Sequence, residues 1–173
     1  MGKKAYIQIY TGNGKGKTTA ALGLAIRASG AGLKVFIAQF TKGILCSEHK
    51  AIAKFAPGIR LKQFGKKSFI TRKPDTDDHR LAKKGYDEIR KIIFSGKFDL
   101  VILDEITIAN KYGLITVDEL LKILKSKPEH VEIVLTGRNA DPRLLKVADL
   151  VTEMKEVKHY YSKGVPARVG IEK

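Results

Sequence analysis

Thr11-Gly12-Asn13-Gly14-Lys15-Gly16-Lys17-Thr18-Thr19 is the stretch that decides how this chain folds. An apolar segment at residues 5–10 precedes it and predicts a strand, and residues 18–29 after it predict a helix. Closely spaced glycines let backbone N–H groups approach an anion, and the positive end of the following helix faces the same point. The stretch therefore predicts a phosphate-binding loop between the first strand and the first helix.

The loop is one residue shorter than the common pattern G-x-x-x-x-G-K-[ST], because only three residues separate Gly12 from Gly16. We expect Lys17 to add a positive charge at the phosphates of ATP and the Thr18 hydroxyl to ligate Mg²⁺. The expected nucleotide-binding residues are Gly12, Asn13, Gly14, Lys15, Gly16, Lys17, Thr18, Thr19 and Arg138. The alternative is a tight turn that binds no ligand.

A second acidic element lies where another predicted strand ends. The run at residues 98–103 is nearly all apolar, as is typical of a central strand covered on both faces, and Asp104 and Glu105 follow it. A carboxylate there can reach the magnesium ion directly or through water. We expect Thr18, Glu105 and Asp104 to form the metal site, with Glu105 as the favoured ligand and Asp104 positioning Glu105 or the Thr18 hydroxyl. Glu105 could instead orient an attacking water molecule. The alternative to a metal site is that Asp104 and Glu105 are two solvated acids at the end of a strand.

Strand and helix patterns alternate along the rest of the chain. Predicted strands are residues 5–10, 33–40, 59–64, 98–103, 131–135 and 149–154, and predicted helices are residues 18–29, 47–55, 76–93, 117–124 and 141–147. This alternation predicts one α/β domain over residues 1–173, a three-layer, mostly parallel sheet of the P-loop NTPase fold. Ligands of such sheets bind beyond the carboxyl ends of the strands. Each motif described above comes directly after a predicted strand and therefore lies at that edge.

The composition is ordinary apart from a net charge of +15. No apolar run approaches the roughly 18 residues of a membrane span, and the early first strand leaves no room for a signal peptide. The single cysteine, Cys46, fits a reducing cytoplasm. The charge permits a nucleic-acid partner, but the lysines are dispersed, and no RNP-type aromatic motif, zinc-finger spacing or basic zipper occurs. We therefore favour a solvated, lysine-rich surface.

Further motifs point to a family. They are Gln39-Phe40-Thr41-Lys42-Gly43, Leu103-Asp104-Glu105, Leu135-Thr136-Gly137-Arg138, and a tail with Val157-Lys158-His159, Gly164-Val165 and Gly170-Ile171-Glu172. With the short phosphate loop and in this order, the chain from Tyr6 to Glu172 resembles the P-loop family of ATP:corrinoid adenosyltransferases. The short loop and the Val-Lys-His tail are the features specific to that family.

The resemblance implies transfer of the 5′-deoxyadenosyl group of ATP to the cobalt(I) of a reduced corrinoid such as cobalamin, with release of triphosphate. It also implies a RecA-like sheet and a homodimer, and a reductase that supplies cobalt(I) is a candidate partner. In this family ATP crosses the loop in the reverse sense to ordinary hydrolases, so that C5′ is exposed. The protein would then act by positioning and by stabilising charge on the triphosphate, without a side-chain nucleophile or general base.

The chain departs from the family pattern in two places. Many members have a helical extension before the first strand, whereas only Met1–Lys4 precede it here. Members also use a Phe and a Trp after the third strand to displace the lower cobalt ligand. Here the basic loop Gly65–Pro74 contains Phe69, but the chain has no Trp. From the missing Trp we expect less efficient displacement of the lower ligand, with the reaction class unchanged. Phe69 joins Lys17 and Glu105 as a catalytic candidate, and the alternative is a loop anchor packed on the core.

The roles of Arg138 and His159 each have two interpretations from the sequence. Arg138 can contact phosphate or ribose, or pair with Asp141. His159 can serve as a base or cobalt ligand, although we favour a strand-end histidine paired with a carbonyl or an acid. For the whole chain, the alternatives are a P-loop ATPase acting on nucleic acid and an ATP-dependent scaffold protein. The short loop and the tail favour the adenosyltransferase.

Overall fold

The computed structural model describes residues 4–66 and 73–172 of the 173-residue chain. Its strands are β1 (Ile7–Thr11), β2 (Val35–Phe40), β3 (Ile59–Phe64), β4 (Leu100–Asp104), β5 (Glu132–Thr136) and β6 (Leu150–Glu153). In the described residues these strands form one sheet in the order β3-β2-β4-β5-β1-β6, and every neighbouring pair is parallel. The predicted parallel α/β sheet is therefore confirmed.

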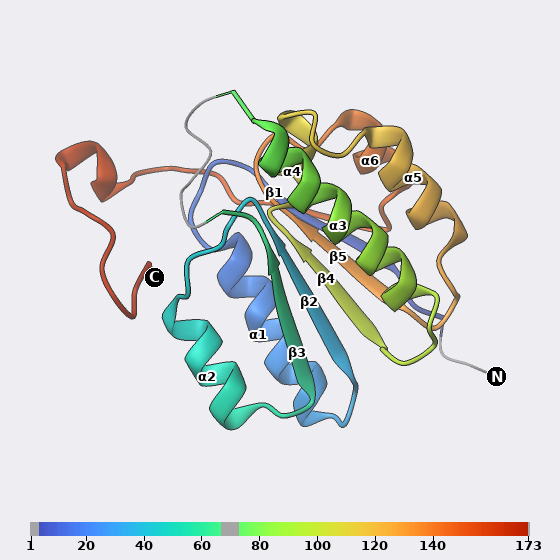
Figure 1. Cartoon of the computed structure of the whole chain (residues 1–173). Helices are drawn as coiled ribbons and strands as arrows, with labels where there is room; N and C mark the ends of the chain where they lie inside the picture. The colour runs from blue at the N-terminus through green and yellow to red at the C-terminus, as the bar shows by residue number, and fades with distance from the viewer. Residues whose placement is uncertain (1–3, 67–72, 173) are drawn as a thin grey trace.

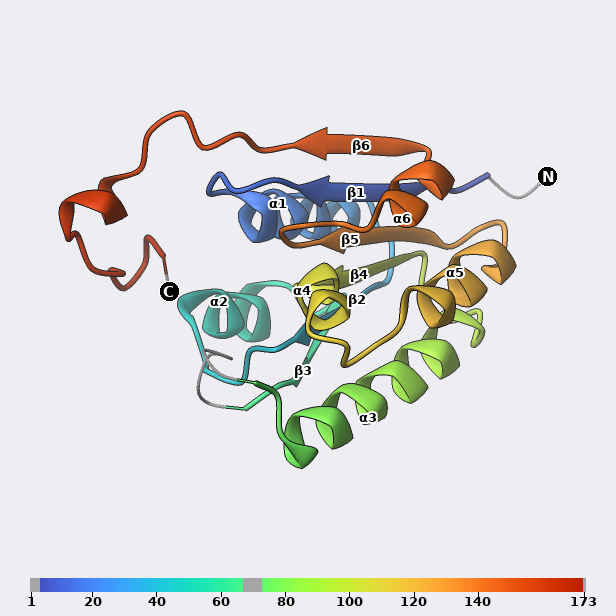
Figure 2. The ribbon, with the colours of Figure 1, turned by 90° about the horizontal axis from the view of Figure 1, so that it is seen from above.

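Helices cover both faces of this sheet (Figure 1 and Figure 2). The helices are α1 (Lys17–Gly30), α2 (Ser47–Phe55), α3 (Thr76–Ile93), α4 (Ile106–Lys111), α5 (Val117–Ser126) and α6 (Pro142–Val147), with a 3-10 turn η1 (Tyr160–Lys163) in the tail. Helices α1 and α2 lie on one face, and α3, α5 and α6 lie on the other. Among the described residues, no helix is both long and apolar enough to cross a bilayer.

The core consists of two apolar clusters, one on each face of the sheet. Side chains of a strand alternate between the faces, so the central strands must be apolar throughout. Ile102 of β4 packs with α1 and α2, whereas its neighbours Val101 and Leu103 pack with the helices of the other face. The nearly all-apolar run that predicted a central strand is thus the middle of the sheet.

Helix α4 is the main element that the sequence patterns did not predict. It is only six residues long and begins directly after Glu105, whose backbone adopts a left-handed conformation with φ 59°. Helix signals in a sequence depend on at least two turns of periodicity, and the β-branched start Ile106-Thr107-Ile108 resembles a strand instead. The turn into α4 matters because it sets the direction of the Glu105 side chain.

Strand register brings polar residues together at the carboxyl edge of the sheet. Gln39 of β2 lies opposite Asp104 of β4. Leu103 pairs with Leu135, so Asp104 and Thr136 follow one residue later on neighbouring strands. On the far side of β5, Tyr10 of β1 pairs with Thr136, and the phosphate loop begins immediately beyond it. The predicted motifs therefore meet at one edge.

Candidate nucleotide-binding site

The phosphate loop is held closed by the chain that follows β6. Gly12 and Gly16 have φ of +93° and +120°, where residues with a Cβ are strained. The Gly14 N–H donates to the Met154 carbonyl at 2.7 Å. A Cβ on Gly12 would lie 2.5 Å from the same carbonyl oxygen, and a Cβ on Gly14 would lie 2.7 Å from it. The loop therefore requires glycine both for conformation and for space.

Lys17 folds back over this loop. Its ammonium donates to the carbonyl oxygens of Gly12 and Gly14, each at 2.7 Å, and the residue is only 8% exposed. Burial lowers the pKa of Lys17, and the nearby Arg138 acts in the same direction. Both effects disfavour the charged form of Lys17, while the charges of Glu105 and Glu156 oppose them. An anion in the loop would stabilise the charged form further.

Asp104 is the centre of a buried hydrogen-bond network. The residue is 1% exposed. One carboxylate oxygen accepts from the Thr18 hydroxyl at 2.9 Å and from the Thr136 hydroxyl at 2.7 Å. The other oxygen accepts from the Gln39 amide at 3.1 Å. Because the Thr18 hydroxyl donates its hydrogen to Asp104, the lone pairs of its oxygen remain available to a ligand.

Glu105 lies next to this network with a different environment. Its backbone N–H donates to the Thr136 hydroxyl at 3.0 Å, and its carboxylate has no hydrogen-bond partner within the described part of the chain. Burial raises the pKa of Glu105, and the charge of Asp104 adds to this, while Lys17, Lys42 and Arg138 oppose it. Glu105 is only half-buried, and a carboxylate that lacks a donor in such a place is a group that a bound cation would stabilise.

The donor set at this point fits Mg²⁺. The Thr18 hydroxyl and the Glu105 carboxylate offer oxygen atoms, which a hard divalent cation prefers, and the Asp104 carboxylate lies behind the Thr18 hydroxyl. Cys46, Glu48 and His49 also place potential ligand atoms within 4.8 Å of one another. However, Glu48 is paired with Lys42 at 3.2 Å, and both ring nitrogens of His49 are hydrogen-bonded. That second cluster is a helix cap.

Arg138 reaches the site from the end of β5. Gly137 has φ +135°, and a Cβ there would lie 2.3 Å from the Thr107 hydroxyl, so a glycine is needed for the chain to pass α4. The Arg138 side chain is exposed and has no partner in the described residues. Asp141 accepts from the backbone N–H of Arg143 at 2.8 Å. Pairing of Arg138 with Asp141, one of the two alternatives, is therefore absent.

The tail forms a second, exposed network on the same loop. The Lys15 ammonium donates to a Glu172 carboxylate oxygen at 2.9 Å and to the Tyr160 hydroxyl at 3.2 Å. Tyr160 itself donates to Glu172, and the Arg168 guanidinium donates to Glu172 at 3.1 Å. Arg168 and the other donors lower the pKa of Glu172. We call these four residues, Lys15, Tyr160, Arg168 and Glu172, the tail clasp.

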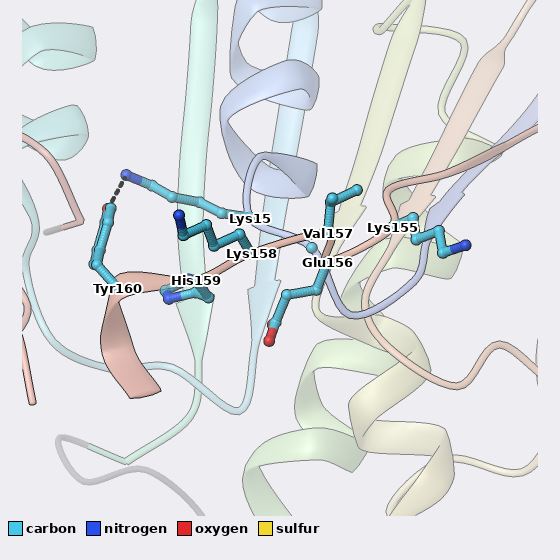
Figure 3. A pocket seen from close by; sticks show the side chains of 8 residues that line it. Lys15, Lys155, Glu156, Val157, Lys158, His159 and Tyr160 are labelled. Atoms are coloured by element: carbon cyan, nitrogen blue, oxygen red, sulfur yellow. Dashed lines mark hydrogen bonds between the residues drawn. The ribbon is translucent and has the colours of Figure 1, made fainter. Parts of the chain in front are cut away.

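A cavity of about 380 Å³ separates the tail from the loop. Its lining comes from Gly14, Lys15 and residues 155–160, and Figure 3 shows Lys15 reaching across to Tyr160. His159 accepts from the Tyr161 backbone N–H at 3.0 Å and so caps η1. The interpretation of His159 as a strand-end residue paired with a carbonyl or an acid was wrong, because it begins a turn and accepts from an amide.

The structure brings together Lys17, Thr18, Asp104, Glu105 and Arg138, as expected of motifs at one sheet edge. It also shows partners that the patterns did not assign, above all Gln39 and Thr136. The signal for Gln39 was a polar residue inside the apolar strand Val35–Phe40, because a buried amide must find hydrogen-bond partners. Phe69 lies outside the described residues.

Comparison with known proteins identifies the family of this chain. The sequence model of the family ATP:corrinoid adenosyltransferase BtuR/CobO/CobP matches residues 3–172. A corrinoid adenosyltransferase of a Sinorhizobium species is 36% identical over 98% of this chain and 81% of its own length. Those of Pseudomonas aeruginosa and Escherichia coli K12 are 32% and 31% identical over 98% of this chain, and over 84% and 86% of their own lengths. Since the match spans nearly all of the sequence, the chain belongs to the ATP:corrinoid adenosyltransferase family.

Proposed function

We propose that this protein transfers the 5′-deoxyadenosyl group of ATP to the cobalt(I) of a reduced corrinoid, with cobalamin as the reference substrate. The observation that carries the proposal is the short phosphate loop, closed against Met154, in a chain of this family. The relatives named above are all corrinoid adenosyltransferases, so the comparisons give no support to an ATPase acting on nucleic acid.

The reaction needs positioning and charge stabilisation more than acid–base chemistry. The cobalt(I) electron pair forms the Co–C5′ bond while the C5′–O bond breaks, and the triphosphate leaves with the electrons of that bond. Lys17 and the loop N–H groups would hold the triphosphate so that C5′ faces the cobalt. They would also stabilise the charge that develops on the leaving oxygen, together with Lys15, Arg138 and the positive end of α1.

Thr18 and Glu105 would hold a magnesium ion, with Asp104 behind them. When bound, Mg²⁺ supplies partial neutralisation of the triphosphate. The chain's own contribution is to orient the Thr18 hydroxyl through its hydrogen bond to Asp104 and to leave the Glu105 carboxylate unpaired for the ion. Loss of Glu105 should therefore weaken ATP binding in the presence of Mg²⁺ much more than in its absence.

Phe69 is our candidate for displacing the lower cobalt ligand. It is the only aromatic residue in the basic segment Gly65–Pro74, which follows β3 at the ligand edge of the sheet. Phe69→Ala should slow transfer to cobalamin more than transfer to a corrinoid that already lacks the lower ligand. Equal losses on both corrinoids, with a lowered melting temperature, would identify a packing residue instead.

We further propose that the protein forms a homodimer and receives cobalt(I) from a reductase. Support for the dimer comes from the edge strand β6, where Leu150 and Val151 are each 45% exposed. A reducing compartment such as the cytoplasm would suit both cobalt(I) and the free thiol of Cys46. Sedimentation equilibrium tests the dimer, and a single species at the monomer mass would contradict it.

The proposed function is tested by incubating the protein with ATP, Mg²⁺ and chemically reduced cobalamin. The corrin absorption should develop the spectrum of a light-sensitive cobalt–carbon product. Lys17→Ala is the matched control, because it removes the loop cation, and it should lose most ATP affinity and nearly all product while remaining folded. Absence of the product from the parent, with phosphate release stimulated by DNA or RNA, would overturn the proposal.

A further inference from the structure

We propose that Gln39 and His49 are positioning residues that hold Asp104, and through it the Thr18 hydroxyl, in the orientation a divalent cation requires. The four side chains form one continuous chain of hydrogen bonds from the start of α2 to the start of α1. The inference rests on the proposed function only in that ATP binds together with the cation.

His49 begins the chain, and its environment fixes which ring nitrogen carries the proton. At the start of α2, its Nδ1 lies 2.9 Å from the backbone N–H of Cys46 and 3.2 Å from the Cys46 carbonyl oxygen. The shorter of the two contacts is made only when Nδ1 accepts, which is the arrangement we infer. The proton of a neutral imidazole then lies on Nε2, which is 2.8 Å from the Gln39 side-chain oxygen. His49 thus presents a donor to Gln39 because its other nitrogen caps the helix.

Gln39 passes this orientation on to Asp104. The residue is fully buried, and its Oε1 receives His49 and also the Gln63 amide at 3.2 Å. Its Nε2 donates to Asp104 at 3.1 Å. Rotating the amide by half a turn would place its oxygen against the carboxylate and its nitrogen against two donors. The surroundings therefore allow a single orientation, the one in which Gln39 donates to Asp104.

Asp104 converts this orientation into the direction of the Thr18 hydroxyl. With one oxygen held by Gln39, the carboxylate plane is fixed and the other oxygen faces the hydroxyls of Thr18 and Thr136. If Gln39 no longer donated to Asp104, that buried carboxylate oxygen would lose its only hydrogen-bond donor among the described residues, and the carboxylate could turn about its own bond. The hydroxyl hydrogen of Thr18 would turn with it, and the lone pairs meant for the cation would lose their direction.

The chain also explains how a weakly packed helix is tied to the site. Ile52 is the only buried residue of α2, so apolar packing alone holds this helix loosely. Its first turn is nevertheless connected through His49 and Gln39 to the buried carboxylate of β4. The start of α2 therefore contributes to cation binding even though none of its side chains is a ligand.

The test compares Gln39→Met and His49→Leu with two controls, and all substitutions are neutral because an added charge would alter cation binding by itself. His49→Gln keeps an acceptor for the Cys46 N–H and a donor for Gln39, since a glutamine at this helix position also caps. Cys46→Ala removes the thiol half of the same cap and leaves the His49 donor in place. Thermal melts confirm that each variant is folded.

The quantity measured is the gain in ATP affinity on going from EDTA to saturating Mg²⁺, determined by calorimetry. Gln39→Met and His49→Leu should each reduce this gain by roughly 10-fold or more, the range known for partners that orient metal ligands. ATP affinity in EDTA should hardly change. His49→Gln should restore the gain, and Cys46→Ala should leave it at the parental value.

A double variant tests whether His49 acts through Gln39. In the Gln39→Met background, His49→Leu should cause no further loss of the gain. Additive losses, an unchanged gain in both single variants, or an equal loss in Cys46→Ala would each overturn the inference. The assay contains no corrinoid, so a parent protein that binds MgATP but makes no cobalt–carbon product would refute the proposed function without touching this result.

Discussion

Two polar networks contact the phosphate loop, one buried and centred on Asp104, the other exposed and centred on Glu172. Asp104 receives only neutral donors, namely the two hydroxyls of Thr18 and Thr136 and the amide of Gln39. Glu172 receives two cations, Lys15 and Arg168, as well as the Tyr160 hydroxyl. The first network holds its carboxylate through neutral groups inside the protein, whereas the second pairs its carboxylate with two cations near the surface.

This difference indicates different roles for the two networks. A buried carboxylate with neutral donors is fixed in place and still attracts a cation, so it suits a site that must be formed before the ligand arrives. Surface ion pairs are weak and are screened by salt, so the tail clasp can open and close at little cost. The same loop thus has a rigid side next to Asp104, where we propose the cation binds, and an adjustable side that faces the tail.

The largest effect is expected from Asp104→Asn, which breaks the buried network at its centre. An asparagine has the same shape, but its amide nitrogen would face a group that donates to Asp104, either the Gln39 amide or the two threonine hydroxyls. We expect the free energy of unfolding to fall by about 1–3 kcal/mol because a buried donor is left unpaired. The Mg²⁺-dependent gain in ATP affinity and the rate of transfer should fall by about 100-fold, the upper end of the range for partners that orient metal ligands. Denaturant melts measure the free energy of unfolding, and calorimetry measures the gain in ATP affinity. If both quantities keep their parental values, Asp104 does not contribute to cation binding.

A smaller effect of opposite sign on stability is expected from Glu105→Gln. The pKa of Glu105 is raised in the folded protein, mainly by burial, so its ionised form opposes folding. This penalty is absent below the unfolded-state pKa and develops fully as the pH rises through the folded-state pKa. Without ligands, the variant should therefore melt a few degrees above the parent at neutral pH, since about 1 kcal/mol corresponds to roughly 2–4 °C in a domain of this size.

Melting curves at several pH values provide the check on this sign. The difference between Glu105→Gln and the parent should shrink as the solution becomes acidic, because the parental carboxyl is then protonated. The stabilised variant should still lose transfer activity, which separates function from stability at this position. A variant that melts below the parent at neutral pH would show that Glu105 has a stabilising partner.

The smallest effect is expected in the tail clasp, from Glu172→Gln. Removing this carboxylate frees Lys15 for phosphate, so ATP affinity at low salt should rise, by less than about fivefold for an exposed ion pair. The rise should disappear in about 1 M salt, where the screening length is roughly 3 Å. Glu156→Gln is the control, because Glu156 lines the same cavity without an ion pair to Lys15. An equal rise in both variants would indicate net charge alone.

The sequence predicted one side of this comparison better than the other. The strands, the loop and the acids at the end of β4 could be predicted because each depends on a local pattern of residues. Gln39 and Thr136 could not be assigned to Asp104, since their contact depends on strand order and register, which one sequence does not reveal. The tail clasp could not be predicted for a related reason, because Lys15 and Glu172 are 157 residues apart and no local pattern links them.

Phosphorus NMR of the products formed from ATP and reduced cobalamin tests the central claim most directly. If the adenosyl group leaves as a unit from a loop that holds the triphosphate, intact triphosphate should appear in proportion to the cobalt–carbon product. Lys17→Ala should produce neither. Formation of ADP and inorganic phosphate alone during corrinoid turnover would contradict the account, because the bond broken would then be at the γ-phosphorus and not at C5′.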